Sequence, residues 1–492
     1  MLYRELLAGI EVLDTNLPAD AQAQEVCADT RKITPGCAFV CMKGTRTDSH
    51  SLAKEAVAQG AGFVVCQAPV ESGVPFVRVE NTRAAFTRMN ANLYHNPQNA
   101  FRYVIGLTGT NGKTSTSYML KAIFDQAGYK TGLIGTMKYL VGDREYPVDK
   151  KDNLLTTPDP DVLFGLLDQM RREEVQVLIM ETSSHALKLD KLQGIHFSAG
   201  IFTNLTQDHL DFHKNMDDYL ASKKKLFDHC DLAVVNFDDP SFAAVVKELP
   251  CPYVSFSGAQ DNRADYIAKN VRLQGAAGVS YECLTRESLY RVRLPIPGSF
   301  SVSNSLAAVA CAMKLGIGEE HIVPALASMD NVKGRIDRVK IDADYSVFID
   351  FAHTPDALQN VLKTLRQFAT GRIITLFGCG GDRDRTKRPL MARVAAALSD
   401  VVIVTSDNSR SEEKADIIAD ILVGMEGAKC SYHVVEDRTQ AIHLAMDLAQ
   451  KDDIVLLAGK GHEEYEIDKT GKHAYSERDV VCEYFNKKGS NK

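Results

Sequence analysis

One stretch decides the fold of this chain: Tyr103-Val104-Ile105-Gly106-Leu107-Thr108-Gly109-Thr110-Asn111-Gly112-Lys113-Thr114. Its apolar first half predicts a buried strand, and its glycine-rich second half leads into a helical pattern from Thr114 to about Gly128. Glycines in such a turn let consecutive backbone N–H groups converge on phosphate oxygens, and the helix N-terminus adds the positive end of its dipole. The stretch therefore predicts a phosphate-binding loop between a strand and a helix.

The loop predicts ATP as its ligand. Its candidate nucleotide-binding residues are Thr108, Gly109, Thr110, Asn111, Gly112, Lys113 and Thr114. The Lys113 ammonium can reach the β- and γ-phosphates, and the Thr114 hydroxyl can bind Mg²⁺. A glycine-rich turn alone is often only a turn, but Gly-Lys-Thr between a strand and a helix favours the functional interpretation. The spacing is shorter than the usual G-x-x-x-x-G-K-[ST], because Leu107 stands where the first glycine belongs.

Two further polar clusters follow the loop along the chain. An apolar strand at residues 177–180 ends in Glu181, and a carboxylate at the carboxyl end of a strand beside a phosphate loop is well placed to hold Mg²⁺. Residues 204–213 contain two histidines and two aspartates, among them His209. The alternatives are a surface glutamate at a strand end and a solvated polar loop.

Apolar runs alternate with amphipathic helices over most of the chain, which predicts an α/β fold with mostly parallel sheets and helices on both faces. Residues 1–100 form a first α/β segment with a helix at 51–59, residues 101–332 the central segment, and residues 333–492 a further α/β series. Within the central segment, polar and apolar residues alternate over 253–297, which predicts an antiparallel insertion before a helix at 302–315.

Composition limits the classes of partner. The chain has 492 residues, a net charge of −7 and a pI near 6, so nothing in its charge favours nucleic acid or an anionic membrane. Neither a signal peptide nor an apolar run long enough to span a membrane is found. Several of the 11 cysteines lie in apolar segments, for example Cys41, Cys66 and Cys311, which predicts buried free thiols and a reducing, cytoplasmic location. We expect a monomer.

Seven ordered motifs together resemble the Mur ligase family of ATP-dependent amide-bond-forming enzymes, over essentially the whole chain. They are Thr108–Thr114, Glu181–His185, Asn204–Asp211, Gly298-Ser299-Phe300 with Asn304, Gly334-Arg335, Asp350–Asp356 and Gly378–Asp384. The resemblance implies three domains: a UDP-binding domain (1–100), a central P-loop ATPase whose mostly parallel sheet is flanked by helices (101–332), and a Rossmann-like C-terminal domain that binds the incoming amino acid (333–492).

The resemblance also assigns roles to residues around the loop. It implies that Asn304, Arg335, His353 and Asp356 contact the nucleotide, and that Lys113, Glu181, His209 and Lys223 are the catalytic residues. Thr114, Glu181, His209 and Lys223 are its metal or phosphate-site residues, with two Mg²⁺ sites. Lys223 aligns with a lysine that is carbamylated in the family, and carbamylation turns a cation into a carboxylate-like ligand for the second Mg²⁺. Without the resemblance, Lys223 reads as one of three surface lysines.

The opening segment, from Asp29 to His50, resembles the UDP-binding domain of those members that add a diamino acid to UDP-N-acetylmuramoyl-L-alanyl-D-glutamate. The resemblance implies that this substrate is bound by Thr30, Thr156, Thr157, Ser183 and Lys191. Lys191 stands where an arginine is usual, so the positive charge is kept while the bidentate fork is lost.

The incoming amino acid is predicted from Asp407-Asn408-Ser409-Arg410, which matches the family's Asp-Asn-Pro-Arg motif for meso-diaminopimelate except at Ser409. An arginine can clamp the carboxylate at the far end of diaminopimelate, which lysine lacks. Arg383, Gly459 and Glu463 match further diaminopimelate contacts, and Glu463 could bind the distal ammonium. We expect meso-diaminopimelate, with L-lysine as the alternative.

The chemistry implied is a two-step ligation. ATP phosphorylates the D-glutamyl γ-carboxylate, and the amine of diaminopimelate then displaces phosphate from the acyl carbon. Two rival interpretations stay open: the folylpolyglutamate synthetase branch, which lacks a UDP-binding domain like residues 1–100, and a nucleotide-gated binding protein without catalysis.

Overall fold

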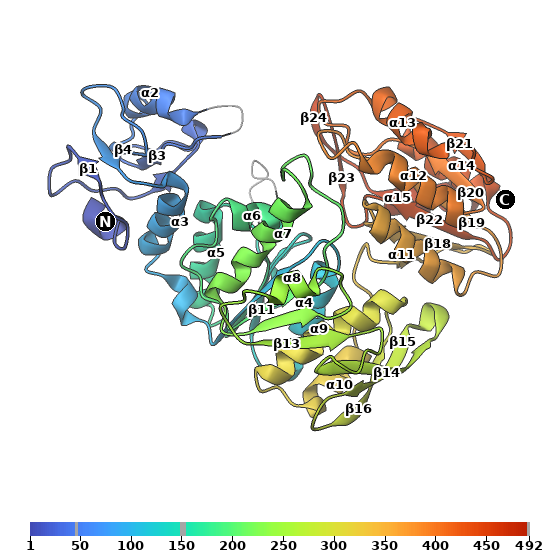
Figure 1. Ribbon diagram of the computed structural model, residues 1–492. Helices are drawn as coiled ribbons and strands as arrows, with labels where there is room; N and C mark the ends of the chain where they lie inside the picture. The colour runs from blue at the N-terminus through green and yellow to red at the C-terminus, as the bar shows by residue number, and fades with distance from the viewer. Residues whose placement is uncertain (45–47, 148–153, 490–492) are drawn as a thin grey trace. The chain divides into compact units, whose positions relative to one another are not determined.

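The computed structural model describes residues 1–44, 48–147 and 154–489 (Figure 1). The chain divides into two compact units. Unit 1 comprises Met1–Gly106, Tyr129–Gly200 and Ser222–Leu232. Unit 2 comprises Leu107–Gly128, Ile201–Ala221 and Ala233–Lys492.

The first part of unit 1 is a sheet whose strands lie in the order β1-β5-β4-β3-β2. Its elements are α1 (Tyr3–Leu6), β1 (Asp14–Thr15), β2 (Val26–Cys27), β3 (Ala38–Val40), α2 (Ala53–Ala58), β4 (Phe63–Cys66), β5 (Phe76–Arg78) and α3 (Thr82–Leu93). Strands β2 to β5 are parallel, and β1 pairs antiparallel with β5. Buried side chains of α1 and α3 pack on one face and those of α2 on the other, which confirms the α/β character expected here.

The helix predicted at 51–59 is shorter than expected. It begins as a 3₁₀ turn, Ser49–Leu52, because the Asp48 carboxylate accepts the backbone N–H of His50 at 3.1 Å. Only Ala53–Ala58 is α-helical.

The second part of unit 1 continues from β6, with strands in the order β6-β10-β7-β8-β9. Its elements are β6 (Tyr103–Thr108), β7 (Thr131–Ile134), β8 (Tyr139–Val141), β9 (Arg144–Glu145), α5 (Pro160–Arg172), β10 (Val177–Glu181) and α6 (Ser184–Lys188). β10 is parallel to β7, and β7, β8 and β9 follow as antiparallel neighbours. β10 is buried along its whole length and ends at Glu181, as predicted, so a carboxylate lies at the carboxyl edge of the sheet.

The first part of unit 2 holds the glycine-rich loop and the strand order β16-β15-β14-β13-β12-β11. Its elements are α4 (Lys113–Gln126), β11 (Ala199–Phe202), α7 (Met216–Lys224), β12 (Ala233–Asn236), α8 (Phe242–Val246), β13 (Tyr253–Ser257), β14 (Tyr266–Leu273), β15 (Val279–Leu284), β16 (Leu289–Leu294), α9 (Ser299–Lys314) and α10 (Glu319–Ala327). The end residues of β11 and α7 fall on either side of the division between the units.

The antiparallel insertion predicted over 253–297 is only partly present. β14, β15 and β16 are antiparallel, but β13 is parallel both to β12 and to the start of β14. The reason is topological: α8 connects β12 to β13, and a strand–helix–strand crossover makes its two strands parallel. Alternating polarity identifies a half-exposed strand but not its direction.

The second part of unit 2 is a sheet in the order β17-β18-β22-β19-β20-β21, parallel except for β17. Its elements are β17 (Asp337–Val339), β18 (Ser346–Asp350), α11 (Pro355–Arg366), β19 (Ile373–Phe377), α12 (Lys387–Leu398), β20 (Val401–Val404), α13 (Lys414–Leu422), β21 (Ser431–Val434), α14 (Arg438–Leu448), β22 (Ile454–Ala458) and α15 (Glu477–Gly489), with a hairpin of β23 (Tyr465–Asp468) and β24 (Gly471–Ala474). This is the Rossmann-like arrangement expected.

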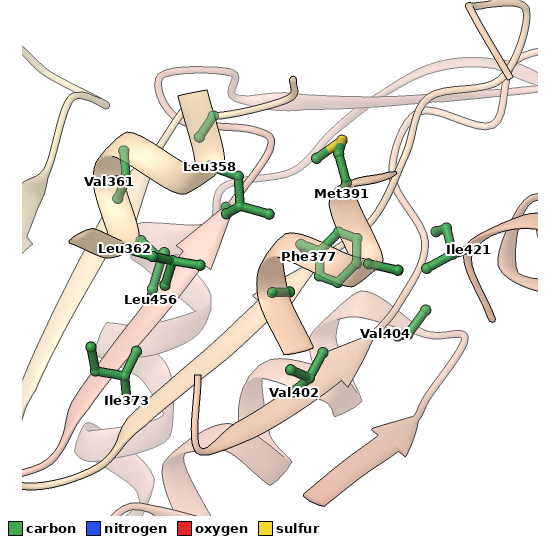
Figure 2. Packing of buried hydrophobic residues seen from close by; sticks show 14 of the residues in the cluster. Leu358, Val361, Leu362, Ile373, Phe377, Met391, Val402, Val404, Ile421 and Leu456 are labelled. Atoms are coloured by element: carbon green, nitrogen blue, oxygen red, sulfur yellow. The ribbon is translucent and has the colours of Figure 1, made fainter. Parts of the chain in front are cut away.

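Both faces of this sheet are covered by helices. On one face Phe377 and Leu456 pack among α11, α12 and α13, for example against Leu362, Met391 and Ile421 (Figure 2). On the other face alternate residues of the same strands pack against α14 and α15. A parallel sheet buried on both faces leaves its carboxyl edge as the place where polar side chains can meet a ligand.

No helix in the described ranges combines the length and apolar character that a membrane-spanning helix needs. Cys41, Cys66 and Cys311 are buried free thiols, as predicted.

Candidate active site

Two glycines give the phosphate loop its shape. Gly109 has φ +142° and Gly112 has φ +87°, and both values are unfavourable for residues with a side chain. A Cβ on Gly109 would collide with the Thr203 hydroxyl, and one on Gly112 with the Asn304 side-chain oxygen. The loop is therefore an open cradle of backbone at the N-terminus of α4, with Asn304 of α9 against it.

We expect Gly109→Ala to destabilise the protein more than Gly128→Ala. Gly128 also has a positive φ, +83°, but a Cβ there meets nothing within 4 Å, so its replacement reports backbone strain alone, about 1 kcal/mol. At Gly109 the collision with Thr203 adds to the strain, and we expect the Tm to fall by about 2–4 °C more than in the control. Equal shifts in thermal unfolding would contradict the geometry described for the loop.

The residues that follow β11 hold the loop by hydrogen bonds. Thr203 Oγ1 donates to the carbonyl of Asn111 at 2.6 Å, and Asn204 both accepts from the Asn111 N–H at 2.9 Å and donates to its carbonyl at 3.0 Å. Lys113 Nζ donates to the carbonyls of Gly109 and Thr110 at 2.8 and 3.0 Å. The segment predicted as a polar cluster at 204–213 thus begins as the scaffold of the phosphate loop.

The predicted nucleotide contacts from the C-terminal part of the chain lie beside the same loop. Arg335 Nη2 donates to Thr114 Oγ1 at 3.3 Å, and its guanidinium carbon lies 5.0 Å from the ring centre of Phe351. Arg335 Nε is buried and has no hydrogen-bond acceptor among the described residues. Asn111 Nδ2 donates to Asp356 Oδ2 at 2.9 Å. An open backbone cradle with a buried guanidinium N–H left over fits an anionic, phosphate-bearing ligand such as ATP.

Asp208 is a buried residue whose carboxylate contacts three basic side chains, and it was not predicted as a site residue from the sequence. Its carboxylate lies 3.1 Å from Lys387 Nζ, 3.5 Å from His209 Nε2 and 3.6 Å from His353 Nε2. Burial alone would raise the pKa of Asp208, but the Lys387 ammonium, together with His209 and a hydrogen bond with His353, outweighs it and holds the pKa well below its usual range. Asp208 therefore stays ionised and orients His209, which has φ +56°. The available signal was the adjacency of Asp208 to His209 in a dense acidic and histidine cluster.

In unit 1, Glu181 and three predicted substrate-binding residues form one hydrogen-bonded group. The fully buried Glu181 carboxylate accepts from the N–H and hydroxyl of Thr136 at 3.2 and 2.9 Å. Thr136 Oγ1 is 3.0 Å from Thr156 Oγ1, while Thr157 Oγ1 donates to the Glu181 carbonyl at 2.8 Å and to Ser183 Oγ at 3.3 Å. The structure thus brings Thr156, Thr157 and Ser183 to the carboxyl end of β10.

Lys191 lies on a small cavity in the same unit. Its ammonium is 2.6 Å from Asp159 Oδ1, and both residues line a cavity of about 230 Å³ that Asp29 and Arg83 also line. Thr30 follows Asp29 in a 3₁₀ turn that the Asp29 carboxylate caps. The lining includes three basic residues, Lys32, Arg83 and Lys191, and three acidic ones, Asp29, Asp159 and Asp161, so its net charge alone favours neither sign of ligand.

Lys223 is buried, with 2% of its surface exposed. The interpretation from residues alone, a surface lysine in a basic run, is therefore wrong. Its neighbour Lys225 is exposed and pairs with Asp190 at 3.1 Å. The physical reason is the helical register of α7, which turns Lys223 inward although the run Lys223-Lys224-Lys225 is uniformly basic.

The residues predicted to bind the amino acid meet at the carboxyl ends of β19, β20 and β22. They are Arg383, Asp407, Asn408, Ser409, Arg410, Gly459 and Glu463. Asn408 Nδ2 donates to Glu463 Oε2 at 2.8 Å, and Arg410 Nη1 donates to the Gly381 carbonyl at 2.8 Å. A Cβ on Gly459, which has φ +116°, would lie 2.6 Å from the Asp407 carboxylate. The carboxyl edge of this sheet therefore brings together Arg383, the Asp407–Arg410 motif and the segment from Gly459 to Glu463.

This cluster contains both basic and acidic side chains. Burial, together with the nearby Arg383, lowers the pKa of Arg410, yet an arginine remains charged at neutral pH. Burial and the Asp407 charge raise the pKa of Glu463. Burial would raise the pKa of Asp407 too, but Lys460 and Arg438 outweigh it and lower that pKa. A cationic and an acidic group on one edge suit a ligand that carries both a carboxylate and an ammonium.

The predicted metal-site residues include the oxygen donors that Mg²⁺ prefers. Glu181 supplies a buried carboxylate and Thr114 a hydroxyl, and a carbamate on Lys223 would supply further oxygens. His209 is a nitrogen donor, which suits Mg²⁺ less well. Glu181 and Lys223 belong to unit 1 and Thr114 and His209 to unit 2.

The phosphate loop and the charged edge of a second parallel sheet define the class of protein as an α/β phosphate-loop enzyme. Three stretches of the chain match known domains: residues 22–102 the Mur ligase family catalytic domain, residues 107–312 the Mur ligase middle domain, and residues 334–461 the glutamate ligase domain of Mur ligases.

Known proteins match over the full length of the chain. The UDP-N-acetylmuramoyl-L-alanyl-D-glutamate–2,6-diaminopimelate ligase of Clostridioides difficile is 39% identical, over 99% of this chain and 100% of its own. That of Clostridium botulinum is 40% identical over 94% of this chain and 95% of its own. A solved structure of a ligase with the same name is 27% identical, with a TM-score of 0.68 over 99% of both chains. The chain therefore belongs to the Mur ligase family, and with it to the ATP-dependent ligases.

Proposed function

We propose that this protein is an ATP-dependent ligase of peptidoglycan synthesis that adds meso-diaminopimelate to the D-glutamyl γ-carboxylate of UDP-N-acetylmuramoyl-L-alanyl-D-glutamate. The observation that carries the proposal is the charged sheet edge of Arg383, Arg410 and Glu463, in the same unit as the phosphate loop. The full-length likeness to ligases named for this reaction supports it.

In the first step the loop binds the ATP phosphates. The backbone N–H groups at Gly109–Gly112, the Lys113 ammonium and the Arg335 guanidinium stabilise negative charge on the transferring phosphoryl group. The Lys113 ammonium donates to two neutral loop carbonyls, and phosphate oxygens, which carry negative charge, can replace them as acceptors. The γ-carboxylate of the substrate attacks the γ-phosphorus, and the products are an acyl phosphate and ADP.

In the second step the α-amine of diaminopimelate attacks the acyl carbon, and phosphate leaves from the tetrahedral intermediate. Arg410 and Arg383 hold the distal carboxylate, and Glu463 accepts hydrogen bonds from the distal ammonium. Lysine has the ammonium but no distal carboxylate, so it would leave the half-buried Arg410 without an anionic partner from the substrate. This difference is the physical basis for preferring diaminopimelate.

The remaining predicted site residues, which come from both units, complete the proposal. Thr30, Thr156, Thr157, Ser183 and Lys191 bind the UDP-muramoyl dipeptide, and Asn304, His353 and Asp356 contact the nucleotide. Glu181, Thr114, His209 and carbamylated Lys223 are the proposed metal-site residues, and bound Mg²⁺ would neutralise phosphate charge. Domains at 1–100, 101–332 and 333–492, a monomeric state and a cytoplasmic location are further parts of the proposal.

We expect Lys223→Ala to reduce ligation by about 10²-fold or more, because the carbamate would be lost with the amine. The matched control is Lys225→Ala, which removes an exposed lysine of the same basic run. Ligation rates with and without added bicarbonate measure the effect, and a short carboxylic acid such as acetate or formate should partly restore Lys223→Ala. Normal activity of Lys223→Ala in bicarbonate-free buffer would show that no carbamate is needed.

The reaction itself is tested by ADP release in substrate-omission assays. We expect rapid ADP formation only when the UDP-muramoyl dipeptide and diaminopimelate are both present, with one ADP for each tripeptide formed. A nucleotide-gated binding protein would hydrolyse ATP at the same slow rate in every mixture. A folate-type ligase would accept a folate substrate in place of the UDP-muramoyl dipeptide.

A further inference from the structure

Lys460 is a fully buried cation beside the proposed amino-acid site, and it has no part in the reaction steps proposed for this site. None of its surface is exposed. Its ammonium donates to Asn408 Oδ1 at 3.0 Å and to the Tyr465 carbonyl at 2.8 Å. It also lies 3.7 Å from Glu463 Oε2 and 3.9 Å from Asp407 Oδ1. Burial of an ammonium is costly unless hydrogen bonds and opposite charges compensate for the lost water, and these partners supply both.

The hydrogen bonds around Lys460 fix the orientation of the Asn408 amide. Asn408 Oδ1 accepts from Lys460 Nζ and from the Ile467 N–H at 2.9 Å, so this atom must be the oxygen. Asn408 Nδ2 therefore faces Glu463 and donates to its carboxylate at 2.8 Å. Tyr465 donates to the other carboxylate oxygen at 3.1 Å. The Glu463 carboxylate is thereby held in one orientation, through a chain of contacts that starts at Lys460.

The same contacts tie the Asp407–Arg410 motif to β23. The Arg410 N–H donates to the Ile467 carbonyl at 3.1 Å, while the Ile467 N–H donates to Asn408. Lys460 binds the Tyr465 carbonyl at the start of that strand. The position of Arg410 relative to Glu463 thus depends on the junction that Lys460 holds together.

We propose that Lys460 is a positioning residue for amino-acid specificity, which orients Asn408 and keeps Glu463 an aligned carboxylate opposite Arg410. The inference rests on the proposed function, because Glu463 and Arg410 receive the distal ammonium and carboxylate of the incoming amino acid. Lys460 itself touches no substrate. Its effect reaches the amino acid through Asn408 and Glu463.

The charged and titratable groups that face Glu463 are Asp407, Lys460, Tyr465 and Arg410. Burial raises the pKa of Glu463 most and Asp407 raises it further, while Lys460 and the hydrogen bonds from Asn408 and Tyr465 lower it. Removal of the Lys460 charge therefore raises the pKa of Glu463 further, so the carboxylate takes up a proton at a higher pH. As the pH falls, the amino-acid site should then lose its affinity for a distal ammonium earlier than in the wild type.

The test compares Lys460→Met and Lys460→Gln with wild type in the full-length enzyme. We expect the KM for diaminopimelate to rise about 10–100-fold, the loss typical of one buried charged hydrogen bond. The KM for ATP should change less than about twofold. The acid side of the pH profile of kcat/KM for diaminopimelate should move to higher pH by about one unit. Lys460→Gln retains a hydrogen-bond donor, so it serves if Lys460→Met does not fold.

The matched control is Lys414→Met, which removes a cation paired with Glu466 of the same strand β23 at 2.9 Å. It should leave the diaminopimelate KM and the pH profile unchanged. In addition, Lys460→Gln combined with Asn408→Ala should be no worse than the poorer single variant, because both act through one contact chain.

Equal losses for ATP and diaminopimelate, or an unshifted pH profile in Lys460→Gln, would overturn the proposal. The wild-type assay separates this failure from failure of the proposed function. If wild type uses lysine instead of diaminopimelate, the assigned reaction is wrong. The positioning role is then judged by the KM of lysine, whose side-chain ammonium would still need Glu463.

Discussion

Lys113→Ala is expected to lower kcat/KM for ligation by about 10³-fold while leaving the fold intact. Lys113 is the first residue of α4, and its ammonium donates to the loop carbonyls of Gly109 and Thr110, which places it at the phosphate loop, where we expect it to bind the β- and γ-phosphates. Removal of one preorganised cation from a phosphoryl-transfer site typically costs two to three orders of magnitude. Steady-state ligation assays measure the expected loss of kcat/KM, and thermal unfolding of the variant tests whether the fold is intact.

The control for Lys113→Ala is Lys121→Ala, two turns further along α4. Lys121 pairs with Asp125 at 2.6 Å on the same helix and lies outside the loop. It should retain most of the activity. Comparable losses in both variants would mean that α4, rather than a phosphate contact of Lys113, accounts for the effect.

Arg410→Ala is expected to lower kcat/KM for diaminopimelate by about 10³-fold and to change the KM for ATP by no more than about threefold. The expected loss is that of two charge-assisted hydrogen bonds to a carboxylate. Arg410 has φ +52° and a guanidinium anchored on the Gly381 carbonyl at 2.8 Å, so its position is set by its own backbone and by the neighbouring loop. Initial rates over a range of each substrate separate the two losses.

Two further variants sharpen the test of Arg410. Arg410→Lys keeps the charge but loses the planar fork, so it should recover only part of the activity. Arg385→Ala removes an exposed arginine paired with Asp420 at 3.0 Å and should behave as wild type. Equal losses for ATP and diaminopimelate in Arg410→Ala would exclude a specific contact with the amino acid.

The sequence predicted the structure best where a few neighbouring residues determine the local conformation. The strand before Thr108, the helix after Gly112 and the carboxylate at the end of β10 lie as predicted, because periodicity and glycine chemistry act over a few residues. The α/β character of residues 333–492 followed from its alternating apolar and amphipathic segments, and its Rossmann-like topology was implied by the family resemblance.

Contacts between residues far apart in the chain could not be predicted from local sequence patterns. Lys387 lies against Asp208 although 179 residues separate them in sequence, and no local signal pairs them. Lys460 lies between Gly459 and Glu463 in the sequence but was not predicted to matter, since only the folded structure shows that its ammonium is buried against Asn408. The burial of Lys223 depends on the inward turn of α7, and the parallel pairing of β13 depends on the α8 crossover.

The proposed reaction joins the UDP-muramoyl dipeptide to diaminopimelate and consumes ATP. The most direct measurement is a competition: wild-type enzyme, ATP, Mg²⁺ and UDP-N-acetylmuramoyl-L-alanyl-D-glutamate with equal concentrations of meso-diaminopimelate and L-lysine, and the product identified by mass spectrometry. We expect the diaminopimelate tripeptide to be the dominant product. A dominant lysine tripeptide, or no tripeptide while ATP is still consumed, would contradict it.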